Sequence, residues 1–339
     1  MRVYGLWRYR ALPDTADRKG AAVIDRKLAE HHFGSRVEFD AELGTLTTYR
    51  VGGTAAAAVH PRGTHDLEEI SEFLKATQCP ILIVGRGSNL LIADAGFEGL
   101  AVFTDALSEV LEVVDATVSA PELRVSANTL LPVLARRSAA LGFCGLEWAV
   151  GVPGTVGGAV RMNAGGHGSD IAASLVRVSL FDIIAGTLSQ VDSHELELRF
   201  RGSRLRPTEL IIDAIFSVTA CNPSEASQTI DEIVHWRREH QPGGQNAGSV
   251  FVNPRPGELS AGELIDSLGL CGHRIGSAEV SAKHANFIQA DPQGSANDVV
   301  KLMAYVRKEV QDRAGIELRS EIRLVGFSAD MTSAAGGAV

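Results

Sequence analysis

The stretch ILIVGRGSN at residues 81–89 gives the first indication of the fold. The four consecutive apolar residues Ile81 to Val84 predict a buried strand, and a glycine-rich loop, Gly85 to Asn89, follows it directly. Glycines let the chain turn sharply and present backbone N–H groups to an anion such as a diphosphate. The loop does not have the GxGxxG spacing. It predicts a ligand-binding turn at the end of a strand.

A second glycine-rich stretch, GVPGTVGGA at residues 151–159, is followed by Met162-Asn163-Ala164-Gly165-Gly166. Small residues at this density leave room for a flat ligand. Either loop alone could be no more than a set of turns. Two such loops in one chain favour a dinucleotide site.

Helices and strands alternate irregularly around these loops. Leu67, Ile70, Phe73 and Leu74 have the spacing of an amphipathic helix over 67–77, which leads into the strand at 81–84. Further strands are predicted at 99–103, 123–127, 176–183 and 210–218, and a helix at 130–141. The pattern predicts an α+β fold.

The sequence changes character after Asn222-Pro223, and we expect a domain boundary near residue 220. The later part predicts helices at 223–238, 261–268 and 295–313 and a closing strand at 321–325. Residues 1–20 are poorly patterned, and residues 328–339 predict a flexible tail.

Composition limits the possible partners. The chain has 339 residues and a net charge of -9, which disfavours binding to nucleic acid or to an anionic membrane. No apolar run reaches the roughly 20 residues of a membrane span, and the start lacks a signal-peptide core, so a cytoplasmic protein is expected. Cys79, Cys144, Cys221 and Cys271 are scattered, which predicts free thiols rather than a disulfide framework or a zinc site. No metal and no obligate protein partner are expected.

Six blocks occur in order between Thr45 and Gly326: Thr48 to Gly53, Gly85 to Leu91, Gly145 to Gly158, Asn246 to Pro254, Ala261 to Ile265 and Glu321 to Gly326. Together they make the sequence similar to the UDP-N-acetylenolpyruvoylglucosamine reductase family, also called UDP-N-acetylmuramate dehydrogenases. The chain resembles the shorter-loop branch, because no aromatic insertion lies between Asp213 and Ser249.

The resemblance implies a FAD-binding fold of the vanillyl-alcohol-oxidase type, with two α+β subdomains and a C-terminal α+β substrate-binding domain. The expected divisions are 21–104 with the closing strand 321–326, 105–220, and 221–320. FAD would be held without a covalent link, and NADPH would be the co-substrate. The implied reaction reduces UDP-N-acetylglucosamine enolpyruvate to UDP-N-acetylmuramate, a step in peptidoglycan precursor synthesis.

The resemblance also assigns roles to individual residues. Arg201 and Glu321 would stabilise the enolate formed from the substrate, and Ser249 would donate the proton. His240, Asn253 and Arg323 would bind substrate, although His240 stands where some relatives carry lysine. The expected cofactor-binding residues are Arg50, Gly85, Arg86, Gly87, Ser88, Asn89, Gly151, Pro153, Gly154, Thr155, Gly157, Gly158, Asn163 and Gly165.

The sequence is also compatible with other interpretations of these residues and of the function. Arg201 lies among Arg199, Arg204 and Arg206, an arrangement also typical of a solvated surface. Many relatives carry Ala-Tyr near the flavin, where this chain has Gly166-His167. The same fold could host a flavin oxidase with another substrate, or a flavin-binding protein without turnover. The joint presence of Arg201, Ser249 and Glu321 argues against both.

Overall fold

The structure, a computed structural model, describes residues 24–115, 121–255 and 257–338. The poorly patterned residues 1–20 lie outside this part of the chain. Among the described helices, none has the length and apolar character needed to cross a membrane.

The first subdomain is built on a four-stranded sheet in the order β1-β2-β5-β3, in which only β1 and β2 are antiparallel. The predicted helix is observed as α2, and its face of Leu67, Ile70, Phe73 and Leu74 is buried. The elements are α1 (Arg26–Phe33), β1 (Val37–Glu42), β2 (Thr54–Val59), α2 (Thr64–Thr77), β3 (Ile81–Val84), β4 (Leu90–Ile92) and β5 (Phe97–Phe103).

The chain end returns to this subdomain. The closing strand β18 (Arg323–Val325) pairs in parallel with β4, and Leu324 lies opposite Leu91. It is shorter than the predicted strand at 321–325, so Glu321 precedes it.

The second subdomain is an antiparallel five-stranded sheet in the order β12-β11-β13-β7-β6, with helices packed on one face. The predicted strands and the predicted helix at 130–141 are confirmed within a few residues. The main elements are β6 (Leu111–Asp115), β7 (Glu122–Ser126), α3 (Leu131–Ala140), α4 (Val156–Met162), β11 (Leu175–Asp182), β12 (Thr187–Asp192) and β13 (Glu209–Ser217). The shorter pieces are β8 (Phe143–Cys144), η2 (Glu147–Gly151), β9 (Gly165–Gly166), β10 (Ser169–Asp170) and β14 (Thr219–Ala220).

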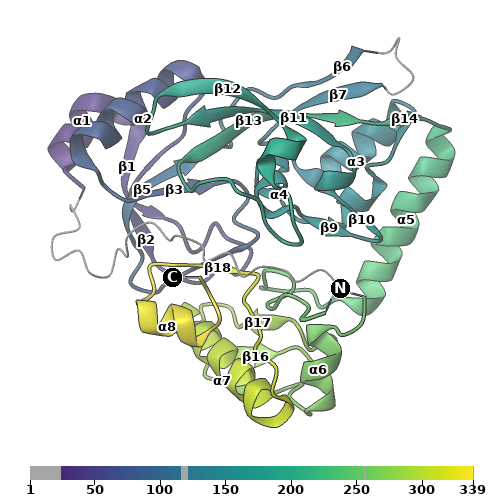
Figure 1. The fold of residues 1–339 in the computed structure, drawn as a ribbon. Helices are drawn as coiled ribbons and strands as arrows, with labels where there is room; N and C mark the ends of the chain where they lie inside the picture. Colours follow the sequence, from purple (N-terminus) through teal and green to yellow (C-terminus); the bar gives the residue numbers. More distant parts are fainter. Residues whose placement is uncertain (1–23, 116–120, 256, 339) are drawn as a thin grey trace.

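Helix α5 (Pro223–His240) runs down one side of the molecule from the second subdomain to the C-terminal part (Figure 1). Its buried residues Ala226, Ile230 and Ile233 belong to the same hydrophobic core as the five-stranded sheet. The core of the C-terminal part instead begins at Ala247 and also takes in Tyr49, Val51 and Leu91 of the first subdomain. We therefore propose a domain boundary after α5 rather than near residue 220.

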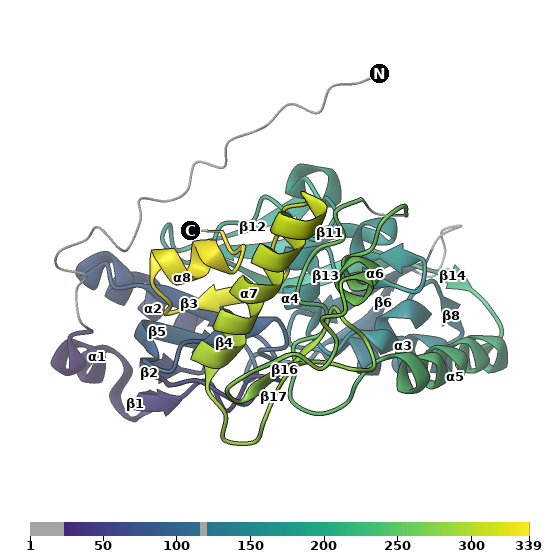
Figure 2. The same cartoon turned by 90° about the horizontal axis from the view of Figure 1, so that it is seen from below.

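The C-terminal domain surrounds a three-stranded sheet, and its helices α7 and α8 lie on the near side in Figure 2. The predicted long helix is confirmed: Val299, Leu302, Met303, Val306 and Val310 are all buried. The elements are α6 (Ala261–Ser267), β15 (Arg274–Ile275), β16 (Ala278–Val280), β17 (Ile288–Ala290), α7 (Ala296–Ala314) and α8 (Ala329–Ala334).

The expectation of a flexible tail from residue 328 was wrong. Ser328 caps α8 by accepting a hydrogen bond from the backbone N–H of Met331 at 3.3 Å. Ala335 is fully buried, and Ser320 donates its backbone N–H to the carbonyl of Gly336 at 2.8 Å. Packing of small residues against α7 therefore orders a segment that composition alone marks as loose.

The prediction that all cysteines are free thiols was also wrong. Cys144 and Cys221, which are 77 positions apart in the sequence, form a disulfide with their Cα atoms 5.8 Å apart. The short strands β8 and β14 pair antiparallel and place Thr219 opposite Cys144, which brings the two cysteines together. Cys79 and Cys271 remain free.

Candidate active site

A cavity of about 550 Å³ lies where the two subdomains and the C-terminal domain meet. Its walls include both glycine-rich stretches, the end of α5, and segments around Ser249 and Glu321. Its size and its mixed apolar and polar walls are those of a site for a large organic ligand.

The two glycine loops both line the cavity and lie in contact with each other. A Cβ atom at Gly85 would lie 2.5 Å from Thr155 Oγ1, so only glycine fits there. Gly87 has a φ of 67°, in the left-handed region that glycine adopts without strain. The close approach of these two loops forms a cradle suited to a diphosphate, which is the feature that FAD binding requires.

Arg201 and Glu321 form an ion pair in the cavity wall, with 2.9 Å between Arg201 Nε and Glu321 Oε1. Arg201 also donates from Nη2 to the carbonyl oxygen of Gly165 at 3.0 Å. It lies in a tight turn that Arg199 and Gly202 close with reciprocal backbone hydrogen bonds, and its φ of 56° is unusual for a non-glycine residue. Strained backbone of this kind is common at functional sites.

Two paired segments place Ser249 beside Glu321. Glu321 donates its backbone N–H to the carbonyl of Val250 at 2.8 Å, and Val252 donates to the carbonyl of Arg319 at 2.9 Å. Asn286 also holds the segment that contains Ser249, since its Nδ2 donates to the carbonyl oxygen of Phe251 at 2.8 Å. The pairing fixes Ser249, which lines the cavity, in register with the Arg201–Glu321 pair.

The first glycine loop is tied to the same segment. Asn89 donates from Nδ2 to the carbonyl oxygen of Glu321 at 3.0 Å, and Arg323 donates its backbone N–H to the carbonyl of Asn89, also at 3.0 Å. The diphosphate cradle and the ion pair are therefore held in one hydrogen-bonded unit.

Burial changes the acidity of several cavity groups. It raises the pKa of Glu321 above its ordinary value, although the charge of Arg201 acts in the opposite direction. The pKa of His167 is lowered by burial and by the nearby charge of Arg237. Burial also lowers the pKa of the Arg237 guanidinium. Glu321 thus accepts a proton more readily than an exposed glutamate, and His167 holds one less readily than an exposed histidine.

The structure brings most of the predicted site residues to this cavity. The catalytic candidates Arg201, Ser249 and Glu321 all line it, and so does Arg323. The predicted cofactor-binding residues that line it are Gly85, Arg86, Gly87, Ser88, Asn89, Gly151, Pro153, Gly154, Thr155, Gly157, Gly158 and Gly165.

Four predicted residues lie outside the cavity lining. Arg50 is exposed, and His240 is exposed next to the cavity-lining Trp236. Asn163 is buried, and its side chain bonds Asp170, Arg199 and Ala172. The side chain of Asn253 accepts from the backbone N–H of Ala261 at 3.0 Å.

Sequence reasoning missed the contribution of α5. Trp236, Arg237 and Gln241 all line the cavity, and Arg237 donates a short hydrogen bond to the carbonyl oxygen of Gly151. Gln241 Oε1 is buried without a hydrogen-bond partner among the described residues, as expected for an atom that meets a ligand. Residues at i, i+1 and i+5 do not lie on one narrow helix face, so their spacing carries no periodic signal in the sequence.

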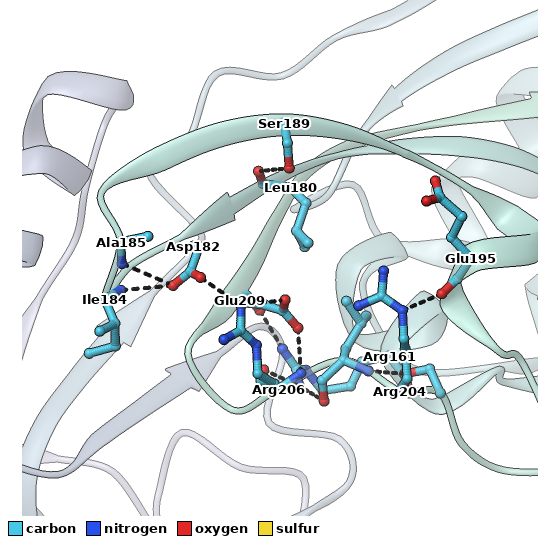
Figure 3. Close-up of polar contacts among 12 residues, drawn as sticks. Arg161, Leu180, Asp182, Ile184, Ala185, Ser189, Glu195, Arg204, Arg206 and Glu209 are labelled. Atoms are coloured by element: carbon cyan, nitrogen blue, oxygen red, sulfur yellow. Dashed lines mark hydrogen bonds and ion pairs between the residues drawn. The ribbon is translucent and has the colours of Figure 1, made fainter.

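A polar network supports the part of the cavity wall at 205–211 (Figure 3). Arg206 donates from Nη2 to Asp182 at 2.6 Å and to the buried Glu209 at 2.9 Å. Arg161 donates to the carbonyl oxygens of Leu205 and Arg206 at 3.3 and 3.1 Å. These bonds fix the loop that leads into β13.

Comparisons with known proteins agree with this geometry. Residues 240–325 match the family model for the C-terminal domain of UDP-N-acetylenolpyruvoylglucosamine reductase, and residues 55–192 match a FAD binding domain. A UDP-N-acetylenolpyruvoylglucosamine reductase of Synechococcus sp. (strain RCC307) is 40% identical over 87% of this chain and 96% of its own length. A relative of the same name from Anoxybacillus flavithermus is 37% identical over 86% of this chain and 94% of its own length.

A solved structure gives the same result. The crystal structure of the UDP-N-acetylenolpyruvylglucosamine reductase from Thermus caldophilus matches 86% of this chain and 99% of its own chain, with a TM-score of 0.72 and 32% identity. The α+β FAD-binding fold predicted from the sequence is thereby confirmed.

Proposed function

Because the chain belongs to the UDP-N-acetylenolpyruvoylglucosamine reductase family, we propose that Arg201, Glu321 and Ser249 carry out its reaction in the cavity described above. The enzyme uses NADPH and FAD to reduce the enolpyruvyl group of UDP-N-acetylglucosamine enolpyruvate, giving UDP-N-acetylmuramate for peptidoglycan synthesis. The observation that carries the assignment of residues is the Arg201–Glu321 ion pair, held in register with Ser249.

The two glycine loops are the proposed binding site of the FAD diphosphate. Asn89 and Arg237, which also line the cavity, hold the loops in place by donating to the carbonyl oxygens of Glu321 and Gly151. FAD bound there would supply the two-electron chemistry that links oxidation of NADPH to reduction of the substrate. Arg50 and Asn163, which lie outside the cavity lining, would act by shaping the loops that surround it.

Arg201 and Glu321 would stabilise negative charge on the substrate. Reduction of the outer vinyl carbon pushes electrons toward the substrate carboxylate, and a planar guanidinium offers charge and two parallel donors to that group. An ionised glutamate would repel the developing charge. In the ion pair the charge of Arg201 holds Glu321, and burial, which raises the pKa of Glu321, would favour its protonation once the anionic substrate brings a like charge beside it.

Ser249 would deliver the proton to the neighbouring carbon of the substrate. A serine hydroxyl is a weak acid, so it works only when it is positioned and its proton is replaced from another group. The paired segments 250–252 and 319–321 provide the position.

The remaining substrate contacts are proposed from position. Arg323 lines the cavity two residues after Glu321 and would meet the anionic substrate. His240 and Asn253 lie outside the cavity lining, and their assignment to the substrate rests on the family resemblance alone. A cytoplasmic reaction remains our proposal, supported by the nucleotide nature of both substrates.

An anaerobic titration of the flavin-loaded protein tests the function. NADPH should bleach the flavin absorbance, and UDP-N-acetylglucosamine enolpyruvate should then restore it. A flavin oxidase of the same fold would recover its absorbance with oxygen but not with the enolpyruvyl sugar. Failure of the sugar to restore the absorbance would contradict the assignment.

A further inference from the structure

Trp236 is a large apolar side chain left exposed at the edge of the active-site cavity. It is 43% exposed, yet it lines the cavity together with its neighbour Arg237 and with Gln241. Leaving an indole ring partly in water forgoes much of the free energy that its burial would contribute. Because ligand pockets are lined mainly by apolar and aromatic side chains, an indole in the cavity wall is a candidate surface for a ligand ring.

Two histidines hold the indole in place. The His240 ring stacks on it with centroids 4.5 Å apart and planes 12° apart. The His167 ring meets it edge to face, with centroids 5.1 Å apart at 90°. His240 is fixed in turn, because its Nδ1 lies 2.8 Å from the carbonyl oxygen of Trp236.

His167 and Arg237 anchor this cluster to the cradle. A Cβ atom at Gly151 would lie 3.1 Å from the His167 ring and 3.4 Å from Arg237 Cδ, so both side chains pack directly against the second glycine stretch. The indole is therefore already ordered, and a ligand ring that stacks on it need not immobilise a free side chain.

We propose that Trp236, held by His167 and His240, stacks on the heteroaromatic base of a nucleotide that binds in the cavity alongside FAD. The inference rests on the proposed function, which brings two such nucleotides, NADPH and the UDP-sugar, to one cavity. Stacking on an aromatic side chain is tolerant of the base, because every base presents a flat π face. The adjacent Arg237 adds positive charge for the phosphates of either nucleotide.

The test measures binding of UDP and of NADP⁺ to the flavin-loaded protein with Trp236 replaced by Phe or by Leu. Leucine keeps an apolar side chain but removes the π face, and phenylalanine keeps the face. Base–aromatic stacking contributes about 1–3 kcal/mol, so Trp236→Leu should weaken the binding of at least one of the two nucleotides by about 5- to 150-fold. Trp236→Phe should recover most of that loss.

The matched control is His235→Ala on the same helix. His235 neighbours Trp236, pairs with Glu239 at 3.1 Å and does not line the cavity. Its replacement should leave the Kd of both nucleotides unchanged. Quenching of indole fluorescence by the bound nucleotide gives a second readout, which should be present in the wild type and largely lost in Trp236→Phe.

Comparing UDP with NADP⁺ shows which base stacks on Trp236. Weaker UDP binding alone identifies uracil, weaker NADP⁺ binding alone identifies the adenine or nicotinamide ring, and weakening of both identifies a shared platform. Unchanged affinity for both in Trp236→Leu, or equal weakening in His235→Ala, overturns the proposal. A wild-type protein whose flavin the enolpyruvyl sugar cannot reoxidise would instead refute the proposed function.

Discussion

At the scale of single residues, the ion pair between Arg201 and Glu321 decides what the cavity can stabilise. Both side chains are about one-fifth exposed, so the pair is partly shielded from water. In such a site a positive charge and a nearby donor stabilise a growing anion more strongly than they would in water.

Arg201→Lys should remain damaging, because an ammonium cannot reproduce the planar fork on a carboxylate. We expect kcat to fall by about 10²–10³-fold, the usual effect of losing one donor to a developing anion. Steady-state kinetics check this, with Arg199→Lys as the control because Arg199 is exposed and does not line the cavity. Near wild-type turnover of Arg201→Ala would show that Arg201 has no role in the reaction.

Glu321→Gln should be milder than Glu321→Ala. An amide still donates a hydrogen bond to the enolate, whereas a methyl group does not. Comparing kcat for the two variants at equal flavin content checks this. Equal losses would mean that Glu321 acts through its charge on Arg201 rather than as a donor.

The residues of this site differ in how well the sequence predicts their role. Arg201, Ser249 and Glu321 were identified through resemblance, and their own spacing carries no signal because positions 201, 249 and 321 meet only in the folded chain. Arg237 was missed because nothing in an isolated Trp-Arg-Arg-Glu-His run distinguishes a buried cation from a solvated one.

At the scale of elements, hydrophobic periodicity predicted the long segments and failed for the short ones. Helices α2 and α7 each bury one continuous stripe, which the sequence displays directly. Strands β8 and β14 have two residues each and exist because they pair with one another. No local pattern of two residues can indicate such a long-range contact.

The disulfide between Cys144 and Cys221, which lies beside the β8–β14 pair, can be tested by counting free thiols. Thiol titration of the protein unfolded without reductant should find two free thiols, those of Cys79 and Cys271, and four after reduction. The double variant Cys144→Ser, Cys221→Ser should lose about 2–4 kcal/mol of unfolding free energy, measured by urea denaturation. Four free thiols before reduction would contradict the cross-link.

At the scale of the whole molecule, the cavity joins three packed units, so the ligand that fills it should stabilise them together. FAD added to the apoprotein should raise Tm with concentration, by an amount equivalent to about 2.7 kcal/mol at 100 times its Kd. Acid precipitation should release the flavin, because neither glycine loop contains a histidine or cysteine to link it. Flavin retained in the pellet would point to His167, the histidine that lines the cavity.

In the proposed reaction Ser249 acts only after the flavin has been reduced, so its loss should affect the two half reactions differently. Rapid-mixing absorbance of Ser249→Ala should show normal bleaching by NADPH and a return of colour with the enolpyruvyl sugar that is slower by about 10²–10⁴-fold, the usual cost of losing a positioned acid. Ser267→Ala, in a helix away from the cavity, serves as the control. Equal slowing of both steps in Ser249→Ala, or of neither, would show that Ser249 does not deliver the proton.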